Sequence, residues 1–356
     1  MKFGGVTIAL FAAVAFPSTT YADSIYEIAA GNDSFSNLAA AVDAAGLKEV
    51  LDGDGTFTVF APPDTAFAAL PDGTVDKLLK PEWVFHLQDL LKYHTLGSIV
   101  QQSDLTDGLE AETLNEERIV INLPNLITTV SNTESNIGTF DIGADNGIVH
   151  AVDAVLLPTS ATSNIVDIAA GNEIFATLVA AVTKAGLIGD LSGEGPLTVF
   201  GKFLDTFITV VDLPLDLLKL FWTFLNIRKA PTDDAFDALS EGTLDSLLLP
   251  ANKQKLIDIL TYHVVADNAH SSTLTAGPAR TLNGATLDIS TDGGVMVNDA
   301  NVVKADILAS NGIIHVIDKV LLPPEEEEAT FEEELDLGWF QAFINSILSW
   351  FMSFFH

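Results

Sequence analysis

Cysteine is absent from the 356 residues, and basic residues are scarce. The lack of cysteine excludes disulfides, thiolate zinc sites and cysteine nucleophiles. Lys and Arg number 16 against 49 Asp and Glu, which gives a formal net charge of −33. A chain this acidic repels phosphate backbones, so we expect no nucleic-acid partner. Apolar residues make up 48% of the chain, enough for packed cores, and the length favours two domains.

The motifs of common enzyme sites are missing as well. The sequence contains no Gly-x-Ser-x-Gly elbow, no Gly-Lys-Ser/Thr phosphate loop and no His-x-x-x-His zinc pattern. We therefore expect no catalytic residues, no cofactor and no metal site. A glycosidase with paired carboxylates stays open as a minor alternative, because such a pair forms in space rather than in sequence.

The N-terminus has the pattern of a secretory signal. Lys2 supplies a positive start, Val6 to Phe16 is an uncharged apolar run too short to span a bilayer, and Thr20-Tyr21-Ala22 offers small residues before a cleavage point. We expect residues 1–22 to be a signal peptide and the protein to be secreted or attached to the cell surface. A buried N-terminal helix is the alternative.

The rest of the chain repeats itself. Similar segments recur first at an offset of 140 residues, then at 169 and 165, and both copies close on Leu-Leu-Pro. The matching pairs are Ala29-Ala30-Gly31-Asn32 with Ala169-Ala170-Gly171-Asn172, Thr58-Val59-Phe60 with Thr198-Val199-Phe200, Tyr93-His94 with Tyr262-His263, and Asn146-Gly147 with Asn311-Gly312. This self-similarity predicts two domains, which we place at 23–160 and 163–324.

Each repeat combines helix and strand patterns. Apolar residues at helical spacing predict a helix from Ser34 to Ala45, and Leu256 to Val265 is typical of a buried helix entering a strand. The two Asn-Gly pairs are typical of hairpins. Short β-rich runs predict strands at 57–60, 119–123, 286–289 and 313–317. Helices beside antiparallel hairpins indicate an α+β fold.

Three ordered motifs, each present twice, resemble the fasciclin (FAS1) domain. They are Thr-Val-Phe-Ala-Pro-x-Asp-x-Ala-Phe, then Tyr-His, then Asn-Gly-Ile-(Val/Ile)-His-x-(Val/Ile)-Asp-x-Val-Leu-Leu-Pro. The resemblance covers about 24–158 and 163–323. It implies that each domain is a β-sandwich-like wedge with a helical layer, usually extracellular. It also implies roles in cell adhesion and in matrix or cell-wall contact, although a fold alone does not fix a function.

The resemblance also implies a candidate site. Tyr93-His94 and Tyr262-His263 match a Tyr-His motif of the family that is implicated in adhesive contact. We favour the second copy, because it matches the family pattern better, and we expect the preceding residues to present it: Leu256, Ile257, Asp258 and Ile259. The residues alone favour a structural role, since a His after an apolar helix is more often a buried imidazole that bonds a backbone carbonyl. Direct contact with a partner is the alternative.

Two further polar motifs are interpreted as structural. His150 and His315 lie in predicted strands, and Asp153 and Asp318 follow three residues later on the opposite face, so we expect no His–Asp dyad. Asn32-Asp33-Ser34 is the one Asn-x-Ser/Thr sequon. Glycosylation at Asn32 is one interpretation, and we favour a helix cap.

The offset jump from 140 to 169 locates an insertion of 29 residues, 201–229. It is highly apolar and separates Phe200 from Ala230-Pro231, whereas Phe60 and Ala61 are contiguous in the first copy. One hypothesis is a retained intron, because 29 codons keep the frame, Gly201-Lys202 can be encoded with a splice donor, and removal restores the family motif. A genuine insertion is the alternative, and a segment this apolar would then need burial, a membrane or a partner.

The C-terminal tail, 325–356, is first acidic and then apolar. Residues 325–336 contain eight acids and no base, which is typical of a solvated, disordered run. Residues 337–356 contain no Asp, Glu, Lys or Arg, and their apolar positions at helical spacing predict an amphipathic helix at an interface. Membrane association through 337–356 is one interpretation, and a lipid-anchor signal or a mis-predicted coding sequence are the alternatives.

Together these observations predict a secreted or cell-surface protein with tandem FAS1 modules and no catalysis. Its expected partner is a cell-surface or matrix protein or a polysaccharide. The alternative is a module that binds an extracellular polysaccharide or a small apolar ligand.

Overall fold

The computed structural model describes residues 23–202, 247 and 249–324. Among these residues, each repeat forms one seven-stranded sheet with its own helices, which confirms the predicted α+β class and the tandem arrangement. The predicted signal peptide, residues 203–229 of the insertion and the tail from 325 onwards lie outside the described residues. Gly201 and Lys202, the first two residues of the insertion, extend a strand.

The two domains use the same order of elements. Those of the first are α1 (Ile25–Ala30), η1 (Asp33–Phe35), α2 (Ser36–Ala44), α3 (Lys48–Leu51), β1 (Phe57–Ala61), α4 (Asp64–Phe67), α5 (Thr74–Leu78), η2 (Pro81–Trp83), α6 (Val84–Tyr93), β2 (Thr95–Leu96), η3 (Gln102–Asp104), β3 (Leu109–Glu112), β4 (Arg118–Asn122), β5 (Leu126–Thr129), β6 (Glu134–Ala144) and β7 (Gly147–Val152). A short helix, α7 (Thr159–Thr162), follows. Those of the second are α8 (Ile165–Ala170), η4 (Glu173–Phe175), α9 (Ala176–Ala185), α10 (Ile188–Ser192), β8 (Leu197–Lys202), η5 (Pro250–Asn252), α13 (Lys253–Tyr262), β9 (Val264–Val265), β10 (Gly277–Arg280), β11 (Thr286–Ser290), β12 (Met296–Val297), β13 (Ala300–Ala309) and β14 (Gly312–Ile317).

The helices and strands predicted from the sequence are present, with bounds that differ by up to three residues. The predicted helix at 34–45 is divided into the turn η1 and the helix α2, and the predicted strands correspond to β1, β4, β11 and β14. Helix α1 begins with a capping box, in which Ser24 and Glu27 satisfy each other's backbone N–H groups. The Asn-Gly pairs join β6 to β7 and β13 to β14, as predicted.

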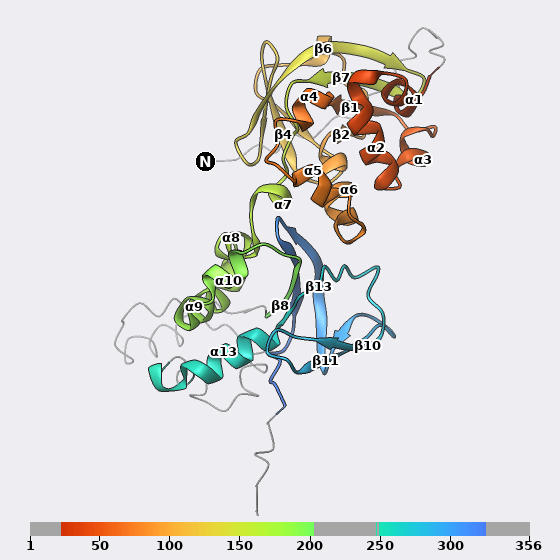
Figure 1. Cartoon of the computed structure of the whole chain (residues 1–356). Coiled ribbons are helices and arrows are strands. Elements are labelled where there is room, and N and C mark those ends of the chain that lie inside the picture. The colour runs from red at the N-terminus through yellow and green to blue at the C-terminus, as the bar shows by residue number, and fades with distance from the viewer. Residues whose placement is uncertain (1–22, 203–246, 248, 325–356) are drawn as a thin grey trace, which may run out of the picture. The chain divides into compact units, whose positions relative to one another are not determined.

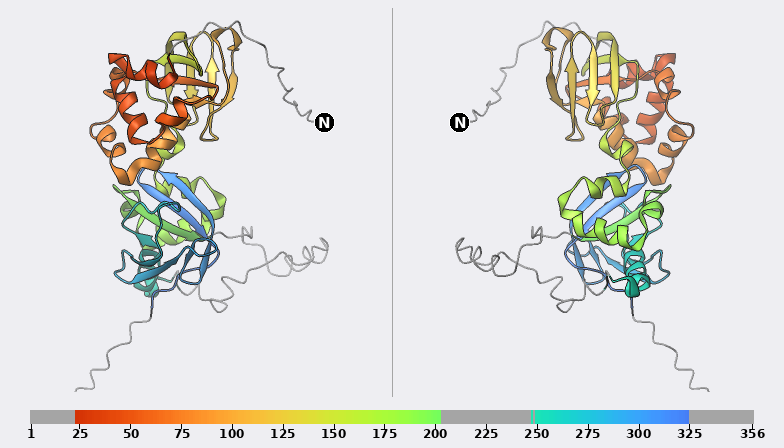
Figure 2. Two further views of the ribbon diagram at one scale, coloured as in Figure 1. Left: turned by 90° about the vertical axis from the view of Figure 1, so that its right-hand side faces the viewer. Right: turned by 90° about the vertical axis from the view of Figure 1, so that its left-hand side faces the viewer.

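The sheet of the first domain has the strand order β2-β1-β7-β6-β5-β4-β3, and that of the second has the equivalent order β10-β11-β12-β13-β14-β8-β9. Neighbouring strands are antiparallel except for the central pairs β1–β7 and β8–β14, which are parallel. The hairpin patterns in the sequence did not reveal these pairs, because the two strands of each lie about 90 residues or more apart in the chain. In each domain the helices cover one side of these strands (Figures 1 and 2).

Each domain has two hydrophobic cores because its central strands are buried on both faces. Val59 of β1 packs with the helices, whereas the next residue, Phe60, packs with residues of β4 and β5. Since β4 and β1 are not neighbours in the sheet, the sheet must fold over this second core. The long strand β6 makes that bend, and its register against β7 shifts twice between Ile137 and Ile142.

A buried asparagine joins the helices to the sheet in each domain. The Asn146 side chain accepts a hydrogen bond from Ile25 N (2.9 Å) and donates to the Leu51 and Gly53 carbonyl groups (2.7 and 2.9 Å), and its own carbonyl accepts from Phe57 N. Asn311 repeats this set in the second domain. The Asn-Gly pair therefore connects α1, α3 and β1 by hydrogen bonds, in addition to forming the turn.

The glycine after this asparagine is required by a close approach of two strands. A Cβ atom on Gly147 would collide with the Phe57 carbonyl group, and one on Gly312 with the Leu197 carbonyl group. Gly108 also has a positive φ (+75°), but it has open space around it. Gly147 also has a positive φ (+157°), so it adds a steric requirement to the conformational one that Gly108 has alone.

We therefore expect Gly147→Ala to lower the free energy of unfolding by about 3 kcal/mol or more, because β1 must move away from β7. Gly108→Ala should cost only about 1 kcal/mol for its backbone conformation. Urea unfolding followed by circular dichroism measures both. Equal losses would contradict the steric explanation.

Candidate functional site

The Tyr-His motif lies where a helix ends and the chain enters the sheet. In the first domain, Tyr93 is the last residue of α6 and His94 caps it. In the second, Tyr262 and His263 have the same places at the end of α13. All four side chains are buried, with exposed fractions of 0%, 2%, 3% and 6% in chain order. The tyrosine and histidine of each Tyr-His motif, which were predicted as contact residues, are thus inside their domain.

Each motif histidine connects the helix end to the segment that closes the domain. His94 Nδ1 donates to the Leu90 carbonyl group (2.8 Å), and its Nε2 accepts from Leu156 N (2.8 Å). His263 makes the equivalent bonds to Ile259 O (2.8 Å) and Leu321 N (2.9 Å). Because Nε2 accepts a backbone N–H, the ring must be neutral with its proton on Nδ1. Burial lowers the pKa of both histidines to about 4.

Each motif tyrosine connects the same helix end to a hairpin. The Tyr262 hydroxyl donates to Thr286 O and accepts from Asn298 Nδ2, both at 3.0 Å. Tyr93 donates to Arg118 O and accepts from Val130 N (3.0 and 3.1 Å). Burial raises the pKa of Tyr93 to about 12. Through these hydrogen bonds the Tyr-His motif acts as an internal anchor of each domain.

The predicted presenting helix has a buried side and an accessible side. Leu256 and Ile259 are buried in the helical core, whereas Ile257 and Asp258 are half-exposed. The Asp258 carboxylate accepts a hydrogen bond from Gln254 on the same helix (2.9 Å), in an exposed position. Of the predicted residues in the second domain, the structure therefore leaves Ile257 and Asp258 at the surface.

The equivalent aspartate of the first domain is covered by α7. Asp89 accepts hydrogen bonds from the Ser160 hydroxyl and from Asn115 Nδ2, and burial raises its pKa. Glu117 accepts the Thr159 backbone N–H through its carboxylate (3.0 Å), and burial raises its pKa too. No local sequence pattern marks these residues, because Asp89 and Ser160 are 71 residues apart and Glu117 and Thr159 are 42 residues apart.

Three residues that make these hydrogen bonds in the first domain are replaced in the second. By the alignment of the repeats, Glu117 is replaced by Ala285, Thr159 by Pro324 and Ser160 by Glu325. A proline has no N–H to donate, and a glutamate cannot replace the Ser160 hydroxyl next to an aspartate. Among the described residues, the Asp258 carboxylate accepts from Gln254, and Asn283, the counterpart of Asn115, donates to the Asp258 backbone carbonyl group instead (3.3 Å).

The other polar motifs have internal partners. His150 Nδ1 accepts from Asp141 N (3.1 Å) and Nε2 bonds Val100 O (2.9 Å), while Asp153 accepts from Asn136, so no His–Asp dyad forms. Asn32 caps η1 through a bond from Ser34 N (2.9 Å). Its counterpart Asn172 caps η4 without being in a sequon, which supports the capping interpretation. Glycosylation at Asn32 stays a prediction.

The described part of the chain contains no cluster of three or more His, Cys, Asp or Glu residues that could hold a metal ion. None of the helices described, moreover, has the length and apolar character needed to cross a membrane.

Comparison with known proteins identifies the family. The fasciclin domain model matches residues 33–158 and 229–323, more than half of the chain. The chain therefore belongs to the fasciclin domain family. The second matched segment begins at 229, where the apolar insertion ends.

Several relatives are similar to large parts of the chain. Protein sll1483 of Synechocystis sp. is 46% identical over 167 residues, which is 47% of this chain and 77% of that protein. Transforming growth factor-beta-induced protein ig-h3 of Sus scrofa is 27% identical over 418 residues, 89% of this chain, and the chain spans 60% of its length. A solved FAS1 domain pair from the insect cell adhesion molecule Fasciclin I is 15% identical, with a TM-score of 0.39, over 83% of this chain and 95% of that one.

The buried histidines predict a loss of stability in mild acid. Their pKa is about 4 when folded and about 6.5 when unfolded, so the unfolded state binds more protons between these values. Stability should fall as the pH drops through this window, by roughly 2 kcal/mol per histidine at pH 5. Urea unfolding at pH 7 and pH 5 measures it. In His263→Gln the acid-induced loss should shrink by one histidine's share, and an unchanged loss would contradict the assignment.

The hydrogen bonds of the motif tyrosine predict a difference in stability between two Tyr→Phe variants. Tyr262→Phe removes a buried hydroxyl with two partners and should cost about 1–3 kcal/mol. Tyr26→Phe removes a hydroxyl that bonds Asp43 at the surface and should cost under about 0.5 kcal/mol. Thermal unfolding of both variants gives the comparison, and similar melting temperatures would argue against an anchoring role.

Proposed function

We propose that the protein is a secreted or cell-surface adhesion protein that binds matrix or cell-surface partners through its FAS1 domains, without catalysis. Membership of the fasciclin domain family and the similarity to ig-h3 support this proposal. The proposed contact surface is the accessible side of α13 in the second domain. Tyr262 and His263 hold this helix in place from inside.

This choice of surface rests on the different hydrogen-bond partners of two equivalent aspartates, Asp89 and Asp258. Asp89 is covered by the segment that follows the first domain, whereas Asp258 bonds Gln254 in an exposed position. Among the described residues, no segment that follows the second domain bonds Asp258 in this way, so we expect a partner to reach this site. Ile257, half-exposed beside Asp258, adds apolar area to the same surface.

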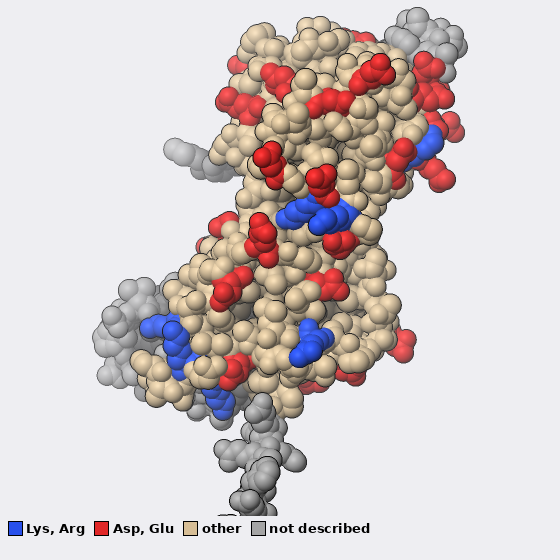
Figure 3. Space-filling model, viewed as in Figure 1, with Lys and Arg blue, Asp and Glu red and all other residues tan. Residues whose placement is uncertain are grey.

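Surface charge narrows the class of partner. Acidic side chains are spread over the face seen in Figure 3, with basic side chains at a few places. Such a surface repels polyanions, so a protein or an uncharged polysaccharide fits it better than an acidic polysaccharide.

Detachment force tests the proposal. Beads coated with the full chain are pulled from surfaces coated with extracellular matrix proteins and with a neutral polysaccharide. We expect Asp258→Asn to reduce the force at least threefold while the melting temperature stays within about 2 °C, because the Asp258 carboxylate is in an exposed position.

The first domain offers the matched control. Asp89→Asn makes the same chemical change at the equivalent position and should leave the force unchanged. Equal forces for all three proteins, or a loss in Asp89→Asn alone, would overturn the proposed contact surface. No force above that of uncoated beads would overturn the adhesive function itself.

A further inference from the structure

The first domain contains its own example of how the proposed contact surface can be covered. At the position equivalent to the exposed aspartate of α13, Asp89 accepts the Ser160 hydroxyl of the segment that follows the domain. The Thr159 backbone N–H adds a second bond, to the Glu117 carboxylate (3.0 Å). Residues 158–162, Pro-Thr-Ser-Ala-Thr, carry no charge, and Ser160 is buried by the contact. An uncharged segment with hydroxyl groups is therefore what this kind of surface holds.

The second domain keeps the acceptor of this contact. Asn283 is fixed by the Thr281 hydroxyl (2.6 Å), as its counterpart is in the first domain. Its Nδ2 donates to the Asp258 backbone carbonyl group (3.3 Å), so the amide lies against the equivalent aspartate. The Asp258 carboxylate bonds Gln254 in an exposed position, and an exposed side-chain bond is exchanged for another at little cost.

Exposed leucines lie at the same end of α13. Leu322 is 51% exposed, whereas its counterpart in the first domain, Leu157, is half-buried. It directly follows Leu321, which bonds the histidine at the end of the helix. Leu282, the neighbour of Asn283, is exposed as well. These side chains offer apolar area that a bound segment would cover.

The sequence that follows the second domain has a different chemistry. Pro324 stands in place of Thr159 and has no N–H to donate. Residues 325–328 are all glutamate, and their charge repels the Asp258 carboxylate. The covering segment is therefore expected on a partner rather than in the chain's own continuation.

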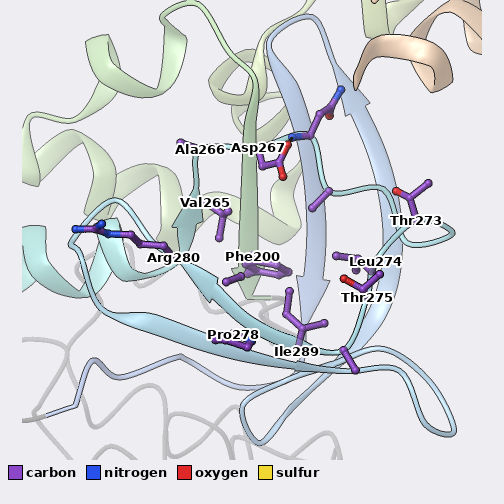
Figure 4. Close-up of a pocket in the computed structure, with 15 residues that line it drawn as sticks. Phe200, Val265, Ala266, Asp267, Thr273, Leu274, Thr275, Pro278, Arg280 and Ile289 are labelled. Atoms are coloured by element: carbon purple, nitrogen blue, oxygen red, sulfur yellow. Dashed lines mark hydrogen bonds between the residues drawn. The ribbon is translucent and has the colours of Figure 1, made fainter. Parts of the chain in front are cut away.

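The pocket beside the loop 266–276 offers no comparable indication (Figure 4). It is open, and Asp267, Thr273 and Thr275 in its lining are exposed. The residues that line it all belong to the second domain, and nothing in them points to an occupant. The α13 surface, in contrast, has the α7 segment of the first domain as its example.

We propose that the α13 surface binds an uncharged segment of a partner protein in which serine or threonine follows a proline, as in α7. The partner's hydroxyl group donates to the Asp258 carboxylate in a charge-assisted bond, and its apolar side chains cover Leu282 and Leu322. An acidic segment is repelled by Asp258 and by the net charge of −33. This proposal rests on the proposed function, because it names the partner of the same surface.

Detachment force from peptide-coated surfaces tests the proposal. One surface carries Leu-Leu-Pro-Thr-Ser-Ala-Thr, the sequence of residues 156–162, and its control carries Leu-Leu-Pro-Val-Ala-Ala-Val, which lacks the hydroxyl groups. A third carries Leu-Leu-Pro-Pro-Glu-Glu-Glu, the sequence of residues 321–327. Beads coated with the full chain should need at least threefold more force on the first surface than on the other two, because weak contacts add up on a dense surface.

The aspartate variants locate the contact. In Asp258→Asn the difference between the peptides should disappear, because a neutral amide accepts a hydroxyl less strongly than a carboxylate does. Asp89→Asn should keep the difference. Equal forces on the three peptides, or a difference that survives in Asp258→Asn, would overturn the assigned partner chemistry.

The other surfaces separate this proposal from the proposed function. If the peptides give equal forces while adhesion to matrix proteins still depends on Asp258, the proposed function stands and the partner chemistry is wrong. Loss of adhesion to every surface overturns both. Asp258-dependent adhesion to the neutral polysaccharide alone would assign the surface to a glycan and would also overturn the peptide segment.

Discussion

A neutral, buried histidine at the end of a helix is the interaction on which each domain depends. His94 and His263 each donate to a carbonyl group four residues earlier in the same helix, and each accepts a backbone N–H from a residue 62 or 58 positions later in the chain. Because the ring is buried, an unsatisfied ring nitrogen would cost about 1–3 kcal/mol, and a protonated ring would cost more. The adjacent tyrosine extends the same connection to the hairpins of the second core. Thus the helices, the closing Leu-Leu-Pro segment and the folded-over sheet meet at one dipeptide.

This arrangement separates support from contact in the Tyr-His region. The motif residues are inside, and the residues they position, Ile257 and Asp258, are at the surface. A substitution of Tyr262 or His263 would therefore disturb the proposed contact surface, although neither side chain lies on it. Loss of function in such a variant says little about contact unless its stability is measured as well.

The two domains show how one scaffold supports different surfaces. In the first, Asp89 and Glu117 bind the segment that follows the domain, and large side chains fill the second core. In the second, Ala285 and Pro324 replace Glu117 and Thr159, and Ala269 and Gly277 stand where the first domain has Val100 and Leu109. The internal bonds of Thr198, His315 and Asn311 are nevertheless the same as in the first domain. Divergence is thus concentrated outside the shared hydrogen bonds.

The sequence predicted two helices, four strands, the two Asn-Gly hairpins and the α+β class, because these follow from local periodicity and turn chemistry. It also indicated a structural role for His94 and His263 from the apolar helix that precedes them. It could not reveal the Asp89–Ser160 bond, which joins residues 71 apart, or the replacement of Leu109 by Gly277, whose recognition needs the strand register around a one-residue deletion. The parallel pairing of β1 with β7 was missed for the same reason, since it joins distant parts of the chain.

The tautomer and the pKa of the two motif histidines give the most direct test of the internal anchor. Nitrogen NMR of the full chain labelled with ¹⁵N-histidine reports the tautomer and the pKa of each ring. We expect two rings in the neutral Nδ1–H form that titrate near pH 4, and the His263→Gln variant should lack one of them. Rings at these positions that titrate near 6.5, or that carry their proton on Nε2, would contradict the account of an internal anchor.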